Sequence, residues 1–333
     1  MSVAVKTKSF AAAVLAGALM FAAPALAGVG FQVLRVPDPE GGTIEVGVWY
    51  PADGPVRTIP MGLNSMEVSP GAPLKGEGLP LVVMSHGHGG FFGGHADTAA
   101  ALAEAGFVTA ALTHTGDNYA DKSRSTEGAN RPRQLRVLVD YMLGGWSEHG
   151  RLDPERVGAF GFSMGGFTVT AAIGGVPDAA KINEHCRQRP QFFDCQLVHH
   201  RPAEPASWTG WKRDDRIKAA VIAAPAVGYA FTPESLGAVK IPVQLWRAEV
   251  DAILPEPFYV QPVLEKLGAR PEYHLVKKAG HFEFLTPCTP EGIKRSPDIC
   301  LPSPGFDREA FHRDFNREVV RFLSEKLSVV NRP

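Results

Sequence analysis

Continuous apolar runs alternate with segments of helical character along most of the chain. The apolar runs, which are typical of strands buried on both faces of a sheet, cover residues 79–86, 107–114, 156–162, 217–224, 241–248 and 271–279. Segments that are rich in Ala or place apolar residues at helical spacing cover residues 95–106, 131–144, 164–175, 255–268 and 308–328. This alternation predicts an α/β fold with a mostly parallel central sheet and helices on both of its faces.

Other segments depart from this alternation. Residues 31–38 and 43–51, with a Gly-Gly pair between them, predict a β-hairpin. Residues 51–79 are rich in Pro and Gly and are expected to form a loop. Residues 177–215 contain two cysteines, two tryptophans and mixed charge. We interpret them as a small insertion over the sheet edge that holds the candidate site, not as a separate domain.

Residues 1–27 have the pattern of a secretory signal peptide. Two lysines precede an apolar stretch over about residues 10–23, and residues 25–27, Ala-Leu-Ala, supply a cleavage pattern of small residues. A membrane anchor is the alternative, but the apolar stretch is short for a transmembrane span. We expect residues 28–333 to form one domain that is exported to the periplasm or the cell exterior.

Composition and charge argue against some classes of binding partner. Hydrophobic residues make up 44% of the chain, which is enough for a sizeable core. The 34 basic and 35 acidic residues give a net charge of −1, so the balance does not favour nucleic acid or an anionic membrane as a partner. Beyond the first 27 residues no segment is long and apolar enough to cross a membrane. We therefore expect no stable membrane insertion of the mature chain.

The four cysteines suit an oxidising compartment. They are Cys186, Cys195, Cys288 and Cys300, and they allow three pairings. We favour the local pairs Cys186–Cys195 and Cys288–Cys300, because each would close a short loop in a polar, Pro-rich segment. A thiolate metal site is the alternative, but neither local pair has C-x-x-C spacing. We expect no metal.

Ser163 lies in a G-x-S-x-G motif, residues 161–165, between a predicted strand and a predicted helix. A serine on such a tight turn has strained backbone angles, and side chains at the flanking glycine positions would collide. In a chain with 35 glycines the motif could also be an ordinary Gly-rich turn. The strand before it, the helix after it and the partners downstream favour a nucleophilic serine.

A serine nucleophile needs a base, and the base needs a carboxylate to orient it. On α/β scaffolds of this kind the chain order is Ser, then Asp or Glu, then His. Asp251 follows the predicted strand 241–248 and His281 follows the strand 271–279, so we expect both at the sheet edge that holds Ser163. Glu249 is the competing carboxylate, and we favour Asp251.

The loop after the strand 79–86 is a candidate to bind the reaction intermediate. A tetrahedral intermediate carries a negative oxygen that needs two preorganised donors. The predicted donors are the backbone N–H groups of Met164, next to the nucleophile, and of His88, after the turn at Gly87. The side chain of His88 would then matter little.

The H-x-H spacing of His86 and His88 also permits a second interpretation, since it begins the zinc motif of the metallo-β-lactamase fold. The aspartate that continues that motif is missing, and His95 lies too far along the chain. A metallohydrolase would also leave the Ser, Asp and His candidates without a role.

Four stretches together resemble the α/β-hydrolase superfamily: LVVMSHGHGG (81–90), GFSMGG (161–166), RAEVDAILP (247–255) and KAGHFEF (278–284). More narrowly, they and the cysteine-bearing stretches resemble secreted bacterial proteins called predicted dienelactone hydrolases, which are similar to platelet-activating-factor acetylhydrolases and, more distantly, to cutinases. The resemblance covers nearly the whole mature chain and implies carboxylic-ester hydrolysis without a cofactor. True dienelactone hydrolases use a cysteine where Ser163 stands, so the family name does not fix the substrate.

We therefore expect a secreted serine carboxylesterase that forms an acyl-enzyme with a small-molecule or lipid-like ester. Phe91, Phe92 and Phe162 lie near the reacting centre in sequence and are candidates for an apolar substrate pocket. Trp208 and Trp211 would form a partial lid or fix the insertion to the domain. A serine peptidase or amidase on the same fold is the main alternative, and a catalytically silent binding protein is another.

Overall fold

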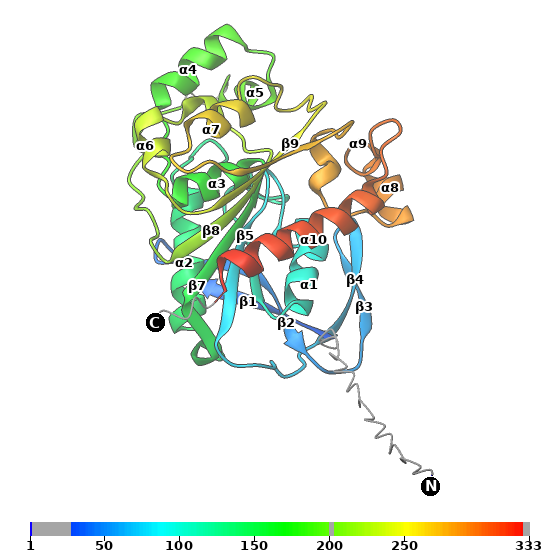
Figure 1. Cartoon of the computed structure of the whole chain (residues 1–333). Coiled ribbons are helices and arrows are strands. Elements are labelled where there is room, and N and C mark those ends of the chain that lie inside the picture. Colours follow the sequence, from blue (N-terminus) through cyan, green and yellow to red (C-terminus); the bar gives the residue numbers. More distant parts are fainter. Residues whose placement is uncertain (2–27, 200–202, 329–333) are drawn as a thin grey trace.

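A ten-stranded sheet forms the centre of the molecule (Figure 1). The structure, a computed structural model, describes Met1, residues 28–199 and residues 203–328. The expected signal peptide over residues 1–27 therefore lies outside the described residues, apart from Met1.

The apolar runs form the parallel part of the sheet. Six strands lie in the order β10-β9-β8-β7-β5-β6, and every neighbouring pair among them is parallel. Their bounds are β5 (Leu79–Ser85), β6 (Val108–Thr113), β7 (Leu152–Phe162), β8 (Ile217–Ala223), β9 (Val243–Ala248) and β10 (Glu272–Val276). All residues of β5 and β6 are buried, which explains their uninterrupted apolar sequence. The predicted parallel sheet is confirmed.

An antiparallel section extends the sheet beyond β6. The expected hairpin is present as β1 (Gly28–Pro37) and β2 (Thr43–Ala52), and β2 pairs with β6. On the far side of β1 lies a second hairpin of β3 (Arg57–Met61) and β4 (Asn64–Pro70).

The second hairpin corrects the expectation of a loop over residues 51–79. In β4 the side chains of Met66 and Val68 are buried. Ser65, which precedes Met66, and Glu67, which lies between the two, are exposed. This alternation has the period of a half-buried strand. Prolines and glycines flank this short alternation, and their number in residues 51–79 favoured a loop over a strand.

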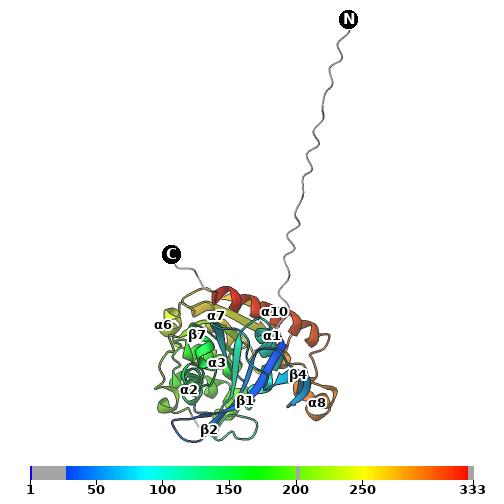
Figure 2. The same cartoon turned by 90° about the horizontal axis from the view of Figure 1, so that it is seen from below.

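Helices cover both faces of the sheet (Figures 1 and 2). α1 (Ala96–Glu104) and α10 (Arg308–Lys326) lie on one face, and α2 (Asn130–Gly144) and α3 (Met164–Ala172) lie on the other. The buried apolar side chains accordingly form two clusters, one against each pair of helices. The predicted α/β architecture is confirmed. Among the described helices none has the length and apolar character required to cross a bilayer.

The helix expected over residues 255–268 is shorter in the structure. It appears as α7 (Val260–Lys266), because prolines precede it and the Glu256 carboxylate accepts hydrogen bonds from the first two N–H groups of the helix. A further short helix, α6 (Pro233–Ala238), was not expected from the sequence.

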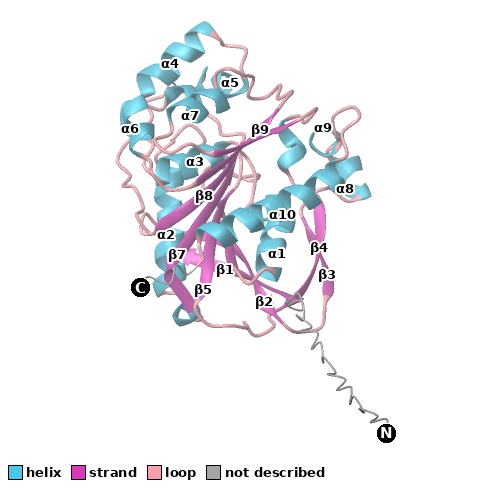
Figure 3. Ribbon diagram, in the orientation of Figure 1, coloured by secondary structure: helices cyan, strands magenta, loops and turns pink. Residues whose placement is uncertain are grey.

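The described part of the insertion is mostly helical and lies at the end of the molecule that holds the carboxyl ends of the parallel strands (Figure 3). It contains α4 (Ala179–Gln188), α5 (Phe193–His199) and the single turn η3 (Pro205–Trp208). The disulfide Cys186–Cys195 joins α4 to α5.

The second disulfide, Cys288–Cys300, lies near the C-terminus. It encloses α8 (Pro290–Arg295) and ends in α9 (Pro297–Cys300). Both local pairings favoured from the sequence are therefore present.

The two tryptophans of the insertion fix it to α3. The Trp208 ring is buried, with its centroid 5.3 Å from that of Phe167. The indole N–H of Trp211 donates to the carbonyl oxygen of Ala171 at 3.2 Å. These contacts support the second of the two alternatives, that the tryptophan pair fixes the insertion to the domain.

Candidate active site

Ser163 occupies a strained turn between β7 and α3. Its φ of 56° and ψ of −118° are angles that residues other than glycine rarely adopt. A Cβ on Gly161 would lie 2.1 Å from the carbonyl oxygen of Gly165, and a Cβ on Gly165 would lie 1.9 Å from that of Ser85. The glycines of the motif therefore have a steric basis, and the turn places the serine hydroxyl at the start of α3.

His281 lies between Ser163 and Asp251. Its Nδ1 is 2.7 Å from Asp251 Oδ2, and its Nε2 is 3.0 Å from Ser163 Oγ. The side chains of His281 and Asp251 are only 3% and 6% exposed. The carboxylate assigns the ring proton to Nδ1, which leaves Nε2 to accept the serine proton. The three side chains form one hydrogen-bonded chain in the order of nucleophile, base and carboxylate.

The turn after β9 orients the carboxylate. Asp251 Oδ1 accepts hydrogen bonds from the N–H groups two and three residues later, at 3.0 and 2.8 Å, so Oδ2 is left to face His281. Glu249 points elsewhere, since its carboxylate lies 2.7 Å from Nζ of Lys277. Of the two carboxylates that the sequence offered, only Asp251 contacts the histidine.

The loop after β5 lies directly against the serine. A Cβ on Gly87 would be 3.2 Å from the Cβ of Ser163. Within the described part of the chain, the backbone N–H groups of His88 and Met164 have no hydrogen-bond acceptor. Both candidate donors are therefore free, and their use by a reaction intermediate stays a prediction.

A buried ion pair that no sequence motif indicated holds this loop. The carboxylate of Asp117 accepts the N–H of Gly89 at 3.1 Å, lies 2.7 Å from Nδ1 of His88, and lies 2.6 Å from Nη1 of Arg131. Arg131 also donates to the carbonyl oxygen of His86. Burial alone would raise the pKa of Asp117, but Arg131 and His88 outweigh it and lower the pKa to about 2. Charged groups outside the motif thus fix the position of the loop.

Asp117→Asn is expected to lower both the free energy of unfolding and kcat. The amide cannot balance the charge of Arg131, and an unpaired buried charge costs about 3–5 kcal/mol. Urea denaturation measures the stability, and initial rates of ester hydrolysis measure kcat. Asp121→Asn, which removes an exposed carboxylate of the same loop, is the matched control.

The pH dependence of this effect follows from the lowered pKa. Because the pKa of Asp117 lies at about 2 in the folded chain and at 3.8 ordinarily, the ion pair stabilises the fold above the ordinary value. The contribution is lost as the pH falls through about 2. The stability gap between wild type and Asp117→Asn should therefore shrink in acid, and a gap that is absent at pH 7 would contradict the role of the pair.

Buried contacts also fix the turn η5 (His281–Phe284), which bears the candidate base. The carboxylate of Glu283 lies 2.6 Å from Nε of Arg308 at the start of α10. Nε2 of His312 is 2.9 Å from the backbone oxygen of Glu283, and Nδ1 of His95 is 3.0 Å from that of the next residue. Burial lowers the pKa of His95 to about 4, so this ring is neutral at pH 7. The Glu283–Arg308 ion pair and the neutral ring of His95 thus help to fix the turn that bears His281.

The H-x-H pair is engaged by the chain itself. Nδ1 of His86 donates to the carbonyl oxygen of Gly87 at 2.6 Å, and its Nε2 accepts the N–H of His114 at 3.0 Å. Burial lowers the pKa of His86 to about 3. With both nitrogens of His86 occupied and His88 facing Asp117, the pair does not present a set of metal ligands.

One other group of possible metal ligands occurs among the described residues, formed by His185, Asp194 and Cys195. The sulfur of Cys195 is in a disulfide. The carboxylate of Asp194 accepts hydrogen bonds from the hydroxyls of Tyr229 and Tyr259 at 2.9 and 2.8 Å. This set of donors does not fit a metal ion, and its contacts fasten α5 to the rest of the domain.

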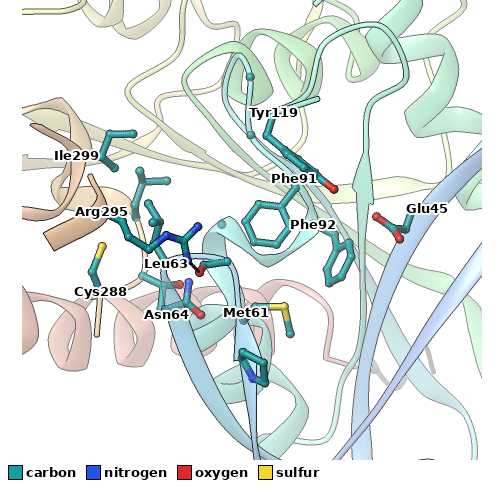
Figure 4. Close-up of a pocket in the computed structure, with 17 residues that line it drawn as sticks. Glu45, Met61, Leu63, Asn64, Phe91, Phe92, Tyr119, Cys288, Arg295 and Ile299 are labelled. Carbon is teal, nitrogen blue, oxygen red and sulfur yellow. Dashed lines mark hydrogen bonds between the residues drawn. The ribbon is translucent and has the colours of Figure 1, made fainter. Parts of the chain in front are cut away.

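A cavity of about 580 Å³ adjoins the loop after β5, since Gly89 and Gly90 are among its lining residues (Figure 4). Phe91 and Phe92 line it, as expected from their place after the His88 loop. Phe162 is not among the lining residues. It is buried, and its ring lies 4.8 Å from that of His281. Phe162 therefore packs against the ring of the candidate base, in a buried cluster that also contains side chains of α10.

Comparisons with known proteins concern one segment of the sequence and the fold as a whole. No protein-family model matches the chain. A segment of 120 residues is 32% identical to "Putative esterase NocK" from Nocardia uniformis subsp. tsuyamanensis and covers 34% of each protein. The chain thus spans about a third of the length of this relative.

The whole fold is similar to a solved structure. A ferulic acid esterase from Streptomyces cinnamoneus superposes with a TM-score of 0.63 and 20% sequence identity, over 94% of this chain and 95% of that one. At this identity the likeness concerns the fold. The protein has an α/β fold of the kind found in that esterase.

Proposed function

We propose that the protein is a serine carboxylesterase with Ser163 as nucleophile, His281 as general base and Asp251 as the orienting carboxylate. The observation that supports this most strongly is the continuous hydrogen-bonded chain, with 3.0 Å from Ser163 Oγ to Nε2 and 2.7 Å from Nδ1 to the carboxylate. The partial sequence match to NocK and the fold of the ferulic acid esterase agree with ester hydrolysis. The finer assignment to dienelactone-hydrolase-like proteins rests on the sequence motifs.

Acylation begins when Oγ of Ser163 attacks the ester carbonyl carbon. Nε2 of His281 takes the hydroxyl proton, and the carbonyl π electrons move to the oxygen, which becomes negative. The tetrahedral intermediate collapses as the C–O bond to the alcohol breaks. His281 gives its proton to the departing alkoxide, so the products of this step are the alcohol and an acyl ester of Ser163.

Deacylation repeats the sequence with water. Nε2 takes a proton from water as the hydroxide oxygen attacks the acyl carbon, and the proton returns to Oγ when the Ser163 ester breaks. The carboxylic acid leaves and the serine is restored. Asp251 keeps the ring proton on Nδ1 and stabilises the imidazolium that forms twice in each cycle.

The free N–H groups of His88 and Met164 would stabilise the negative oxygen in both steps. Backbone donors fixed before the reaction need no reorganisation when the charge develops, which makes such a pair effective. The buried Asp117–Arg131 pair supports this function, since it fixes the loop on which His88 lies.

A serine peptidase or amidase is the competing function, and a matched pair of substrates separates the two. We expect hydrolysis of p-nitrophenyl acetate and no measurable hydrolysis of p-nitroacetanilide, because p-nitrophenolate is a much better leaving group than the anion of p-nitroaniline. Comparable kcat/KM values on both would favour the amidase. Hydrolysis of neither, together with no reaction with a fluorophosphonate, would favour a silent binding protein.

We also propose that the chain is exported and that residues 28–333 form a single hydrolase domain. The charged and apolar pattern of residues 1–27 supports export. The two disulfides agree with an oxidising compartment. Mass spectrometry of the secreted or periplasmic protein should find an N-terminus at Gly28.

A further inference from the structure

The cavity beside the candidate site is enclosed by segments far apart in the chain. Its walls come from the tip of the β3–β4 hairpin, the loop at residues 89–94, and the segment from residue 285 to residue 299. Two of these segments adjoin the candidate machinery, since residue 89 follows His88 and residue 285 follows the turn of His281. Because Gly87 lies against Ser163 and Gly89 lines the cavity, the cavity begins about two residues, or about 7 Å of chain, from the nucleophile, so that one substrate molecule can reach both.

The cavity is shaped by aromatic and aliphatic side chains. Phe91 lies near the centre of the lining residues drawn in Figure 4, and its ring contacts that of Tyr119 edge to face, with 6.0 Å between the ring centroids. The Phe91 ring packs closely against Gly62 and Gly93, since a Cβ on either glycine would lie only 2.7 or 2.5 Å from the ring. Aliphatic side chains complete the lining, from Met61, Leu63, Leu285 and Ile299. A volume of about 580 Å³ with such walls suits a ring-sized apolar group.

The charges around the cavity are not symmetric. Arg295 and Glu45 lie on opposite sides, with the two phenylalanines between them (Figure 4). Arg295 donates to the backbone oxygen of Gly62 at 3.2 Å, and within the described residues it has no carboxylate partner. Among the described lining residues, Arg295 is the one cation and Glu45 the one carboxylate.

We propose that this cavity binds a ring-sized apolar group of the substrate ester, and that Arg295 binds a carboxylate at the outer end of that group. Glu45 on the opposite wall would repel the same carboxylate, so the two charges together fix one orientation of the ring. The substrate class is then an ester that carries an apolar ring with a free acid group. This inference rests on the proposed esterase function.

The charge on the substrate is tested with isosteric pairs. 4-Acetoxybenzoate and 4-acetoxybenzamide place the ring on the alcohol side of the ester, and monoethyl terephthalate and ethyl 4-carbamoylbenzoate place it on the acyl side. Acid release in a pH-stat gives kcat/KM for all four. Arg295→Gln should lower kcat/KM for the carboxylate of one pair by about threefold to fivefold, the range for a solvent-exposed ion pair, and leave its amide unchanged.

Lys294→Gln is the matched control for the charge. Lys294 precedes Arg295 in α8, is exposed and does not line the cavity. The pair that responds to Arg295→Gln identifies whether the acyl or the alcohol part occupies the cavity. For each substrate pair, the kcat/KM of the carboxylate is divided by that of its amide. If Arg295→Gln changes this ratio no more than Lys294→Gln does in either substrate pair, the role of Arg295 is refuted.

The volume is tested by filling it. Ile299→Trp places a large ring in the cavity, and Leu301→Trp adds the same ring two residues later at an exposed position outside it. We expect Ile299→Trp to reduce kcat/KM on the ring esters about tenfold or more, with ethyl acetate hydrolysed as by wild type. Equal loss on ethyl acetate, or no loss on any ring ester, would overturn the assignment of the cavity.

These outcomes differ from a failure of the esterase proposal itself. If Ser163→Ala hydrolysed ethyl acetate as fast as wild type, the proposed function would fail before the cavity came into question. If Ser163→Ala is inactive while Ile299→Trp and Arg295→Gln behave as their controls, the function stands and the cavity proposal alone is wrong.

Discussion

Ser163→Ala is expected to lower kcat for ester hydrolysis by about 10⁴-fold to 10⁶-fold, the range for loss of a nucleophile in a triad. Without Oγ no acyl-enzyme forms, and His281 has no proton to accept from the serine. The fold should persist, because alanine keeps the Cβ that the strained turn already accommodates. Initial rates on p-nitrophenyl acetate measure the loss, with thermal unfolding recorded on the same samples.

Ser324→Ala is the control for this change. Ser324 is exposed on α10 and far from the turn in sequence, so its variant should keep the activity of the wild type. Activity of Ser163→Ala within a few-fold of this control would refute the role of Ser163, because a properly folded protein would then hydrolyse esters without its hydroxyl.

The second large effect concerns the loop after β5. Gly87→Val is expected to reduce kcat by about 10²-fold to 10³-fold, comparable with the loss of an oxyanion donor. Even a Cβ at this position would lie 3.2 Å from the Cβ of Ser163 and 3.3 Å from the ring of Phe162. A branched side chain must therefore displace the loop, and with it the backbone N–H of His88.

His88→Ala is the matched comparison, because it removes a side chain of the same loop and keeps the backbone. The structure shows that the ring of His88 contacts Asp117, which Arg131 and Gly89 also hold. We expect the variant to keep most of the activity. A loss as complete as that of Ser163→Ala would mean that the His88 ring takes part in the chemistry, and the backbone assignment would be wrong.

The sequence predicted the parallel sheet well because its physical signal is local. Each strand buried on both faces is a continuous apolar run, and the residues at the carboxyl ends of neighbouring strands must meet. This logic led to Ser163, Asp251 and His281, which the structure brings into contact. Their catalytic roles stay predictions.

The features that the sequence did not predict depend on contacts between distant segments. Nothing in the spacing of Asp117 and Arg131 connects them to the loop at residues 86–90, since the contact arises only when α2 packs beside β5. The Glu283–Arg308 pair likewise joins the His281 turn to the last helix. Such buried pairs leave no periodic pattern in the chain.

The lining of the cavity could likewise be predicted only in part from the sequence. Phe91 and Phe92 were accessible to sequence reasoning because they follow the loop of His88, whereas Met61 and Ile299 line the same space from a hairpin and a disulfide-bounded segment. Phe162, next to the nucleophile in sequence, packs under His281 instead. Proximity in sequence to a catalytic residue therefore does not determine which side of the site a side chain faces.

The central claim is that Ser163 is the nucleophile of an esterase, and labelling tests it most directly. Purified protein is treated with a fluorophosphonate, digested, and analysed by peptide mass spectrometry, with p-nitrophenyl acetate activity measured in parallel. We predict one added phosphonyl group, located on Ser163, with loss of activity in proportion to labelling and no labelling of Ser163→Ala. Labelling at another residue, or full esterase activity in a protein whose Ser163 is completely modified, would contradict the account.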